Sequence, residues 1–95
     1  MTRYTLSPAA KHDITEIWLY TADQWGVDQA DEYVRQIEDN LYKVAVGLRI
    51  AQPFDRHWKI RSGHHLCVFS KAADHKIHVI RILHERMDIP SQERP

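Results

Sequence analysis

The sequence of 95 residues lacks the features that mark several large classes of protein. Its single cysteine, Cys67, excludes an intramolecular disulfide and a cysteine-based zinc site, and we expect it to be a small core residue. Its three glycines form no phosphate-binding glycine-rich loop. No run approaches the ~18 apolar residues that cross a bilayer, and the start, MTRYTLSP, lacks the apolar stretch of a signal peptide. We therefore expect a cytoplasmic protein without a membrane segment.

Charge is balanced over the whole chain but divided unevenly along it. Residues 1–46 hold four Lys/Arg and eight Asp/Glu, whereas residues 47–95 hold nine and five. Six of the seven histidines lie in the second half, so mild acid makes that half more basic. The sign of the charge alone does not choose between nucleic acid and an acidic protein as its partner. Length and composition predict one folded domain over residues 1–95.

Two helices are predicted after a short strand at residues 3–6. Ser7 followed by proline is typical of a helix start, Gly26 of a helix end, and Asp28 of the N-cap of a second helix. Apolar residues at helical spacing predict the buried stripe of each helix. The first stripe is Ala10, Ile14, Ile17, Trp18, Thr21 and Trp25, and the second is Ala30, Tyr33, Val34, Ile37, Leu41, Val44, Ala45 and Leu48. Trp18 and Trp25 are accordingly predicted to be core residues.

The pattern changes to strands after Pro53. Residues 57–63, 64–71 and 76–84 are rich in β-branched and aromatic residues and are separated by turn signals. The predicted order is βααβββ, an α+β fold in which a helical hairpin packs on one face of a largely antiparallel sheet. In the last strand, alternation predicts one face made of Ile77, Val79, Arg81 and Leu83. The uncovered face of the sheet then needs the C-terminal segment or a partner.

The histidines do not predict a metal site. His64-His65 are adjacent and His75 and His78 are three apart, so in a strand each pair points to opposite faces. We expect neither a metal ion nor a cofactor. Direct binding of nucleic acid is also not expected, because the basic half has neither a Lys/Arg-rich helix nor a pattern of exposed aromatic residues.

The stretch RILHERMD, residues 81–88, has two interpretations. In a ribonuclease, His84 would transfer a proton while Arg61, Arg81 and Arg86 held the phosphate. A second proton-transfer partner is missing, because all four tyrosines lie in the first half of the chain. In the other interpretation, which we favour, these charges are structural or bind a protein, with Arg81 paired to Asp88 or to an acidic group of the helices.

Four stretches occur in the order typical of a known family: YTLSPAAKHDITEIW, WGVDQADEYV, SGHHLCVFS and IRILHERMD. In them the chain resembles the ParE-type toxins of the RelE/ParE superfamily, the toxin half of bacterial type II toxin–antitoxin pairs. The resemblance spans most of the chain and implies the βααβββ fold. One departure is His64-His65, where relatives commonly carry an arginine or a single histidine after the glycine.

The resemblance also implies partners and contact residues. A ParD-like antitoxin would wrap the toxin in a hetero-oligomer, and DNA gyrase would be the target. The antitoxin is expected at Trp18, Leu19, Trp25 and Tyr33. The target is expected at Arg61, Arg81, His84, Arg86 and Asp88.

Two alternatives to a gyrase-binding toxin are kept. The ribonuclease branch of the superfamily cuts messenger RNA on the ribosome, and here it would use His84 with Arg61 and Arg81. The missing C-terminal tyrosine favours the gyrase-directed branch. A third interpretation is a non-toxic relative that serves as an interaction module.

Overall fold

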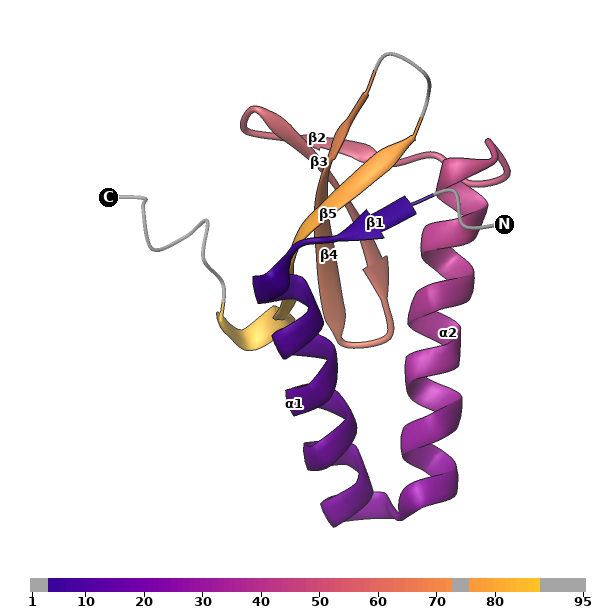
Figure 1. Cartoon of the computed structure of the whole chain (residues 1–95), viewed down its shortest axis with the longest axis vertical. Coiled ribbons are helices and arrows are strands. Elements are labelled where there is room, and N and C mark those ends of the chain that lie inside the picture. Colours follow the sequence, from indigo (N-terminus) through magenta and orange to yellow (C-terminus); the bar gives the residue numbers. More distant parts are fainter. Residues whose placement is uncertain (1–3, 73–75, 88–95) are drawn as a thin grey trace.

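The computed structural model, which describes residues 4–72 and 76–87, has two layers, a helical hairpin and a five-stranded sheet (Figure 1). The elements in chain order are β1 (Tyr4–Leu6), α1 (Pro8–Trp25), α2 (Val27–Ala45), β2 (Gln52–Phe54), β3 (His57–Ser62), β4 (His65–Lys71), β5 (Ile77–His84) and the 3-10 helix η1 (Glu85–Met87). The strand order is β1-β5-β4-β3-β2, with β1 parallel to β5 and the other neighbours antiparallel. The α+β prediction is confirmed. The strand that was not predicted is β2, whose proline is tolerated because β2 lies at the edge of the sheet.

The helical hairpin forms largely where its capping residues predict. The Ser7 hydroxyl accepts a hydrogen bond from the N–H of Ala10 at 2.9 Å and donates to the carbonyl of Ile80 at 2.7 Å, which ties the start of α1 to β5. Gly26, at φ +100°, separates the two helices. The prediction of Asp28 as N-cap is wrong, because α2 begins directly after Gly26 and Asp28 lies in its first turn, where negative charge suits the helix dipole. In the described part of the chain, neither helix is long and apolar enough to cross a membrane.

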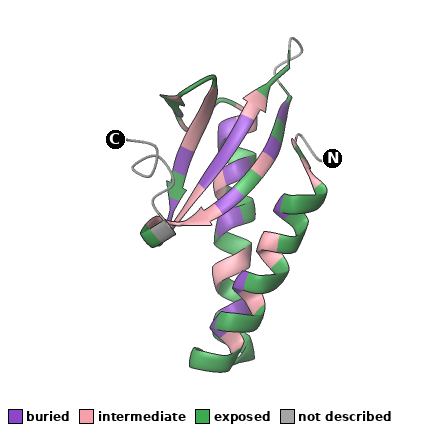
Figure 2. Cartoon of the chain, turned by 90° about the vertical axis from the view of Figure 1, so that its left-hand side faces the viewer, coloured by how far each residue is buried: buried purple, intermediate pink, exposed green. Residues whose placement is uncertain are grey.

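The core lies between the helical hairpin and the face of the sheet that it covers (Figure 2). Its fully buried residues include Ala10, Ile37, Leu41, Cys67, Phe69 and Val79. The prediction of Cys67 as a small core residue is confirmed, and burial raises the pKa of its thiol to about 12. At neutral pH Cys67 is therefore a protonated, inert side chain.

The closed end of the hairpin extends beyond the sheet, and this makes part of the predicted core wrong (Figure 1). Trp25 is 72% exposed, although it continues the stripe of α1, because α2 only begins at this point and no strand lies opposite. At the other end Leu48 is also exposed, since α2 already ends at Ala45. Helical spacing thus predicted the stripe correctly, but it did not predict how far the stripe is covered.

A β-bulge in β5 changes which residues face the core. Val68 pairs with Arg81 and the next residue of β4 pairs with Val79, so Ile80 is an extra residue in β5. Beyond this residue the alternation shifts, and Ile82 is buried while Arg81 is exposed. The predicted face that ran without interruption from Ile77 to Leu83 is therefore wrong.

The face of the sheet away from the helices carries charged side chains in β3. Ile60 and Ser62 are buried on the helix side, so Lys59 and Arg61 alternate to the other side. Ser62 accepts a hydrogen bond from the amide of Asn40 in α2 at 2.9 Å, which confirms its direction. The prediction that the C-terminal segment or a partner covers the sheet face away from the helices stays a prediction, because residues 88–95 lie outside the described residues.

Candidate protein-binding site at the histidine end of the sheet

Three histidines meet where the β3–β4 turn, the end of β5 and η1 come together. We call this cluster the histidine end; it consists of Tyr33, Arg61, His64, His65, His84 and Glu85. The backbone N–H of Glu85 donates to the carbonyl of His64 at 2.8 Å and joins η1 to the turn. Residues separated by up to 52 positions in the chain thereby form one surface.

Tyr33 of α2 holds the β3–β4 turn in place. Its hydroxyl accepts a hydrogen bond from the backbone N–H of His64 at 2.9 Å and lies 2.6 Å from Nδ1 of His65. The hydroxyl also donates to the carbonyl of Ser62 at 3.4 Å, so Tyr33 contacts three successive parts of the turn region, at Ser62, His64 and His65. Gly63 sits between these partners at φ +62°, and a Cβ there would lie 2.7 Å from the Tyr33 ring. The turn therefore requires glycine both for its backbone and for the close approach of Tyr33.

His65 is a neutral residue at physiological pH. Burial first, and then the neighbouring His84 and His64, lower the pKa of its ring to about 4, against the smaller opposing effect of the nearby carboxylates. The ring meets Tyr33 and His84 edge-on, with centroids 5.5 and 5.0 Å apart. His65 is thus a packing and hydrogen-bonding residue.

Glu85 joins Arg61 and His64. One carboxylate oxygen accepts from the guanidinium of Arg61, and the other lies 2.8 Å from Nδ1 of His64. These hydrogen bonds, that of Arg61 first, lower the pKa of Glu85 to about 2. The carboxylate is therefore charged at neutral pH and neutralises the cation beside it. Sequence reasoning missed Glu85, although its place directly after His84 in a charged stretch was a signal.

His84 is bound through one ring nitrogen. Its Nδ1 accepts the backbone N–H of Arg86 at 2.9 Å, so Nδ1 carries no proton and the neutral ring is protonated at Nε2. The Arg86 side chain is exposed on η1. All three histidines use Nδ1 for a contact within the protein. Among the residues that the structure describes, no group of three His, Cys, Asp or Glu could hold a metal ion.

Arg81 lies at a second contact, with Asp13 of α1. Its Nε and Nη2 donate to the two carboxylate oxygens at 2.8 and 3.0 Å, and the backbone N–H of Ile82 donates to Asp13 at 2.9 Å. Asp13 thus covers the edge of β5 where β1 has ended. Of the two partners predicted for Arg81, the structure contains the acidic group of a helix, while Asp88 lies outside the described residues. Asp13 was not singled out in the sequence, where its signal is its place beside the stripe residue Ile14.

The predicted target residues are therefore distributed over two neighbouring contacts. Arg61 and His84 belong to the histidine end, Arg86 follows it on η1, and Arg81 is held by Asp13. The sequence places all four tyrosines in the first half of the chain, but α2 brings Tyr33 into the same cluster as His84 through His65. Distance along the chain was a poor guide to distance in the fold.

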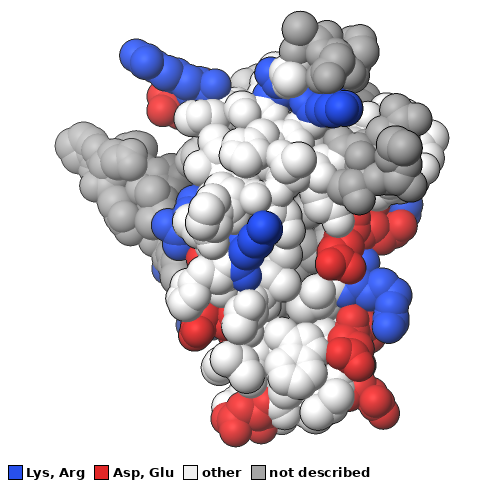
Figure 3. Space-filling view, viewed as in Figure 1, with Lys and Arg blue, Asp and Glu red and all other residues white. Residues whose placement is uncertain are grey.

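The predicted antitoxin residues do not form one patch. Trp18 is half-buried and donates its indole N–H to Asp31 of α2 at 2.8 Å, while Leu19 and Trp25 are exposed. Tyr33 belongs instead to the histidine end. Tyr20 and Val27, which were not predicted, add exposed apolar surface near the closed end of the hairpin. Figure 3 shows a largely uncharged face with one basic side chain near its middle, and acidic side chains along the side where Figure 1 places α2.

Comparison with known proteins assigns the family. The model of the family described as "ParE toxin of type II toxin-antitoxin system, parDE" matches residues 4–89. The chain is 38% identical over 92 residues to "Toxin ParE1" of Mycobacterium tuberculosis (strain ATCC 25618 / H37Rv), with 93% of this chain and 94% of that protein covered. It is 32% identical over 94 residues to "Toxin ParE1" of Caulobacter vibrioides, covering 93% and 94%.

The fold is also similar to that of a solved structure. A chain in a structure described as "Chromosomal ParDE TA system from P. aeruginosa" matches with a TM-score of 0.73 at 14% identity, covering 85% of this chain and 92% of that one. At this identity the match concerns the fold, and the assignment rests on the family model and on the sequence relatives. The family predicted from the four sequence stretches is confirmed, and the chain belongs to the ParE toxins of type II toxin–antitoxin systems.

Proposed function

We propose that this toxin acts in the bacterial cytoplasm by binding DNA gyrase with the histidine end and Arg86, and that a ParD-like antitoxin neutralises it. The observation that carries the choice of binding over catalysis is the contact between Arg61 and Glu85. A cation that stabilises a phosphate in a transition state has to face the substrate. Here the guanidinium is already bound to a carboxylate that stays charged at neutral pH and would repel a phosphate.

The second cation supports the same choice. Arg81 is held by both oxygens of Asp13, whose side chain is nearly buried. Its charge is therefore balanced by Asp13 within the protein. Arg86 is the exposed arginine that remains on η1, and it is suited to meet an acidic protein surface.

A second candidate, a ribosome-dependent endoribonuclease, is favoured by one observation. Tyr33, His65 and His84 lie in contact, so groups able to transfer protons are not limited to His84. The hydroxyl of Tyr33 and Nδ1 of each histidine are, however, engaged within the protein. For this reason catalysis is the second candidate.

The closed end of the hairpin supports the proposal for the antitoxin. Leu19, Trp25 and Val27 are each more than half exposed, which is unusual for large apolar side chains so close together in the chain. Acidic residues of α2 begin directly beside them, at Asp28. An amphipathic segment with apolar anchors and basic flanks fits this surface, and we assign it to the antitoxin.

One experiment separates the two targets. The purified chain is added to gyrase with relaxed plasmid and ATP, and in parallel to ribosomes that are translating a messenger. We expect blocked supercoiling or trapped cleaved DNA, and an intact messenger. A cut messenger with unaffected gyrase would overturn the proposal in favour of the endoribonuclease.

Variants locate the surface in the same assays. Arg86→Glu should weaken gyrase inhibition, whereas Arg56→Glu, a matched change at the exposed β2–β3 turn, should not. His84→Gln should have a modest effect on a binding surface, but would cost roughly 100-fold or more if His84 were a general acid or base. Equal loss in Arg86→Glu and Arg56→Glu would show that the histidine end is not the contact.

A further inference from the structure

His84 lies directly before η1, at the position where the side chain of an N-cap residue accepts a backbone hydrogen bond. Its Nδ1 accepts the N–H of Arg86, the second residue of η1, at 2.9 Å. Serine, threonine, asparagine and aspartate are the usual residues at such a position, and their oxygens remain acceptors when the pH falls from neutral to mildly acidic. An imidazole nitrogen differs from them, because it accepts a hydrogen bond only while it carries no proton.

The packing of the His84 ring fixes which of its atoms meets Arg86. The ring of His64 stacks on it, with centroids 6.3 Å apart and planes at 19°, and the ring of His65 meets it edge-on at 5.0 Å. If the ring turned over, a carbon atom would take the place of Nδ1 and could not accept the N–H. The contact with Arg86 therefore requires an unprotonated Nδ1.

The three histidines of the histidine end respond differently to a proton. Nδ1 of His64 lies 2.8 Å from the ionised carboxylate of Glu85, which can only accept, so this nitrogen is already protonated and acid turns the contact into an ion pair. His65, with a pKa of about 4, stays neutral in mild acid. A backbone N–H can only donate, so the contact between His84 and Arg86 is lost when Nδ1 takes up a proton.

The other titratable groups around the three rings keep their charge between about pH 7.5 and 5.5. They are Tyr33 of α2, Arg61 of β3, Glu85 and Arg86 of η1, and Asp13 of α1. Arginines stay charged in this interval, the pKa of Glu85 is about 2, and burial raises the pKa of the Tyr33 hydroxyl. Histidine is the side chain whose charge ordinarily changes here. Mild acid therefore acts on this surface through His64 and His84.

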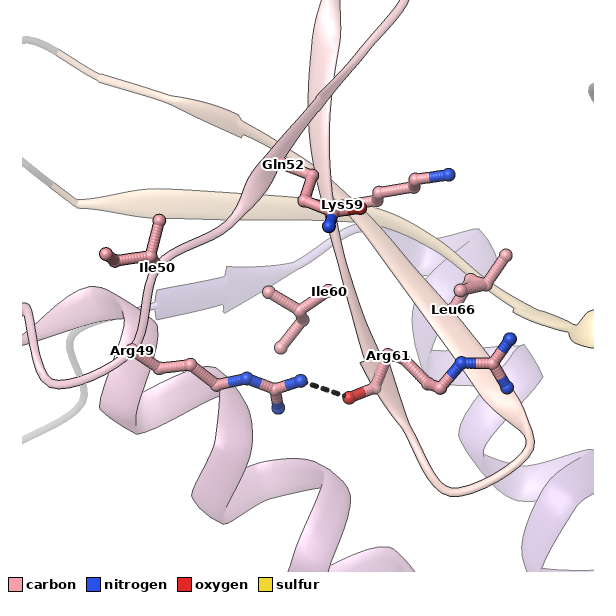
Figure 4. Close-up of a pocket in the computed structure, with 7 residues that line it drawn as sticks. All are labelled: Arg49, Ile50, Gln52, Lys59, Ile60, Arg61 and Leu66. Carbon is pink, nitrogen blue, oxygen red and sulfur yellow. Dashed lines mark hydrogen bonds between the residues drawn. The ribbon is translucent and has the colours of Figure 1, made fainter.

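Of the two arginines beside these rings, Arg86 is the one that depends on His84. Arg61 is held from two sides, because Arg49 donates to its backbone carbonyl at 2.6 Å and Glu85 binds its guanidinium. Figure 4 shows the first of these contacts, with the Arg61 side chain extending away from Arg49. Arg86 is exposed, and among the described residues no ion pair holds its guanidinium. The position of its side chain therefore follows the backbone of η1.

We propose that His84 positions Arg86 through this cap, and that a proton on Nδ1 releases it. With an uncharged ring, the cap holds η1 as the structure describes it. In mild acid the N–H of Arg86 loses its acceptor, and the arginine is no longer held in one place. His84 then acts through Arg86, as a positioning residue. The effect on gyrase rests on the proposed function, in which Arg86 meets the target, whereas the cap itself does not depend on it.

The cap is tested by nuclear magnetic resonance on the isotope-labelled full-length chain, followed between about pH 7.5 and 5.5. We expect the amide resonance of Arg86 to move with the same midpoint as the ring of His84. His84→Asn supplies an oxygen that accepts the N–H two residues further on at either pH, so this variant should lose most of that movement. His12→Asn, the same change at an exposed histidine of α1, should keep it.

Two results would overturn the cap. One is an amide of Arg86 in the wild-type chain that does not follow the ring of His84, a measurement that needs no variant. The other is an amide that moves equally in His84→Asn. Thermal unfolding of each variant checks that it is folded.

The consequence for the target is measured as the affinity for gyrase at the same two pH values. Comparison of the wild type with His84→Asn cancels the charge changes of His64 and His65, which both proteins share. From the higher to the lower pH we expect the wild type to lose about fivefold relative to the variant, as for one hydrogen bond. A constant ratio would overturn the positioning of Arg86 for the target. If neither protein binds gyrase at any pH, the proposed function is wrong, and the amide titration still decides the cap.

Discussion

The hydroxyl of Tyr33 lies 2.7 Å from the position that a Cβ of residue 63 would occupy, so helix α2 and the β3–β4 turn meet at Gly63 with no room for a side chain. The same hydroxyl binds the two residues that follow the glycine. A helix residue thereby determines the shape of a hairpin turn on which the candidate site depends.

We expect Gly63→Ala to destabilise the protein by about 2–3 kcal/mol, because it adds a clash with Tyr33 to the strain of a left-handed backbone. Gly47→Ala is the matched control. Its φ is +84° but nothing lies within 4 Å of the added Cβ, so it should cost only about 1 kcal/mol. Urea denaturation measures both. Equal losses would mean that Tyr33 moves aside freely.

Asp13→Ala should lower the free energy of unfolding by about 2 kcal/mol, because it leaves the N–H of Ile82 and the guanidinium of Arg81 without their acceptor. Glu16→Ala, three residues further along α1, removes an exposed carboxylate whose pairing with His12 at 3.8 Å is weak. It should change stability by less than about 0.5 kcal/mol. If the two variants unfold at the same urea concentration, the contact to Arg81 contributes nothing.

His65 should make the protein less stable as the pH falls from about 6.5 towards 4. Its pKa is lowered to about 4 in the folded protein from an ordinary 6.5, so in this range the unfolded chain binds more protons than the folded one. Because the ring is partly exposed, solvent screening reduces the effect, and we expect a loss of about 1 kcal/mol between pH 7 and 5. His65→Gln should lose less over this interval when both proteins are unfolded with urea. An identical pH dependence would contradict the lowered pKa.

Trp25→Ala should weaken binding of a ParD-like antitoxin by tenfold or more, since exposed tryptophans are frequent anchors of protein interfaces. The free energy of unfolding of the Trp25→Ala toxin alone should change by less than about 0.5 kcal/mol, because the side chain is mostly exposed. Tyr42→Ala, an exposed aromatic residue on the last turns of α2, is the control and should bind normally. Calorimetric titration with the antitoxin measures both. An unchanged affinity would move the antitoxin contact away from the closed end.

Much of the fold could be predicted because its signals are local. Ser7 and Gly26 mark the ends of α1 through their capping chemistry, and the stripe through Ile37 and Leu41 identifies the buried face of α2. The predicted strands lie within two residues of β3, β4 and β5. The short strand β2 was missed, because its proline is acceptable only at a sheet edge and the sequence does not say which strands lie at an edge.

The candidate site was predicted only in part. Arg61 and His84 do lie together, but their partner Glu85 and the role of Tyr33 depend on how α2 crosses the sheet. Likewise, the sequence contains no sign that Ile80 is a bulged residue, since the bulge arises from the register between β4 and β5.

The sequence by itself determined the family, the order of helices and strands, and the burial of Cys67, because periodicity, capping and turn residues act over a few positions. Tertiary structure alone decided that Asp13 meets Arg81, that Tyr33 joins the histidine end, and that Trp25 remains exposed. Each of these depends on where one element ends relative to another, and that is settled by packing between segments far apart in the chain.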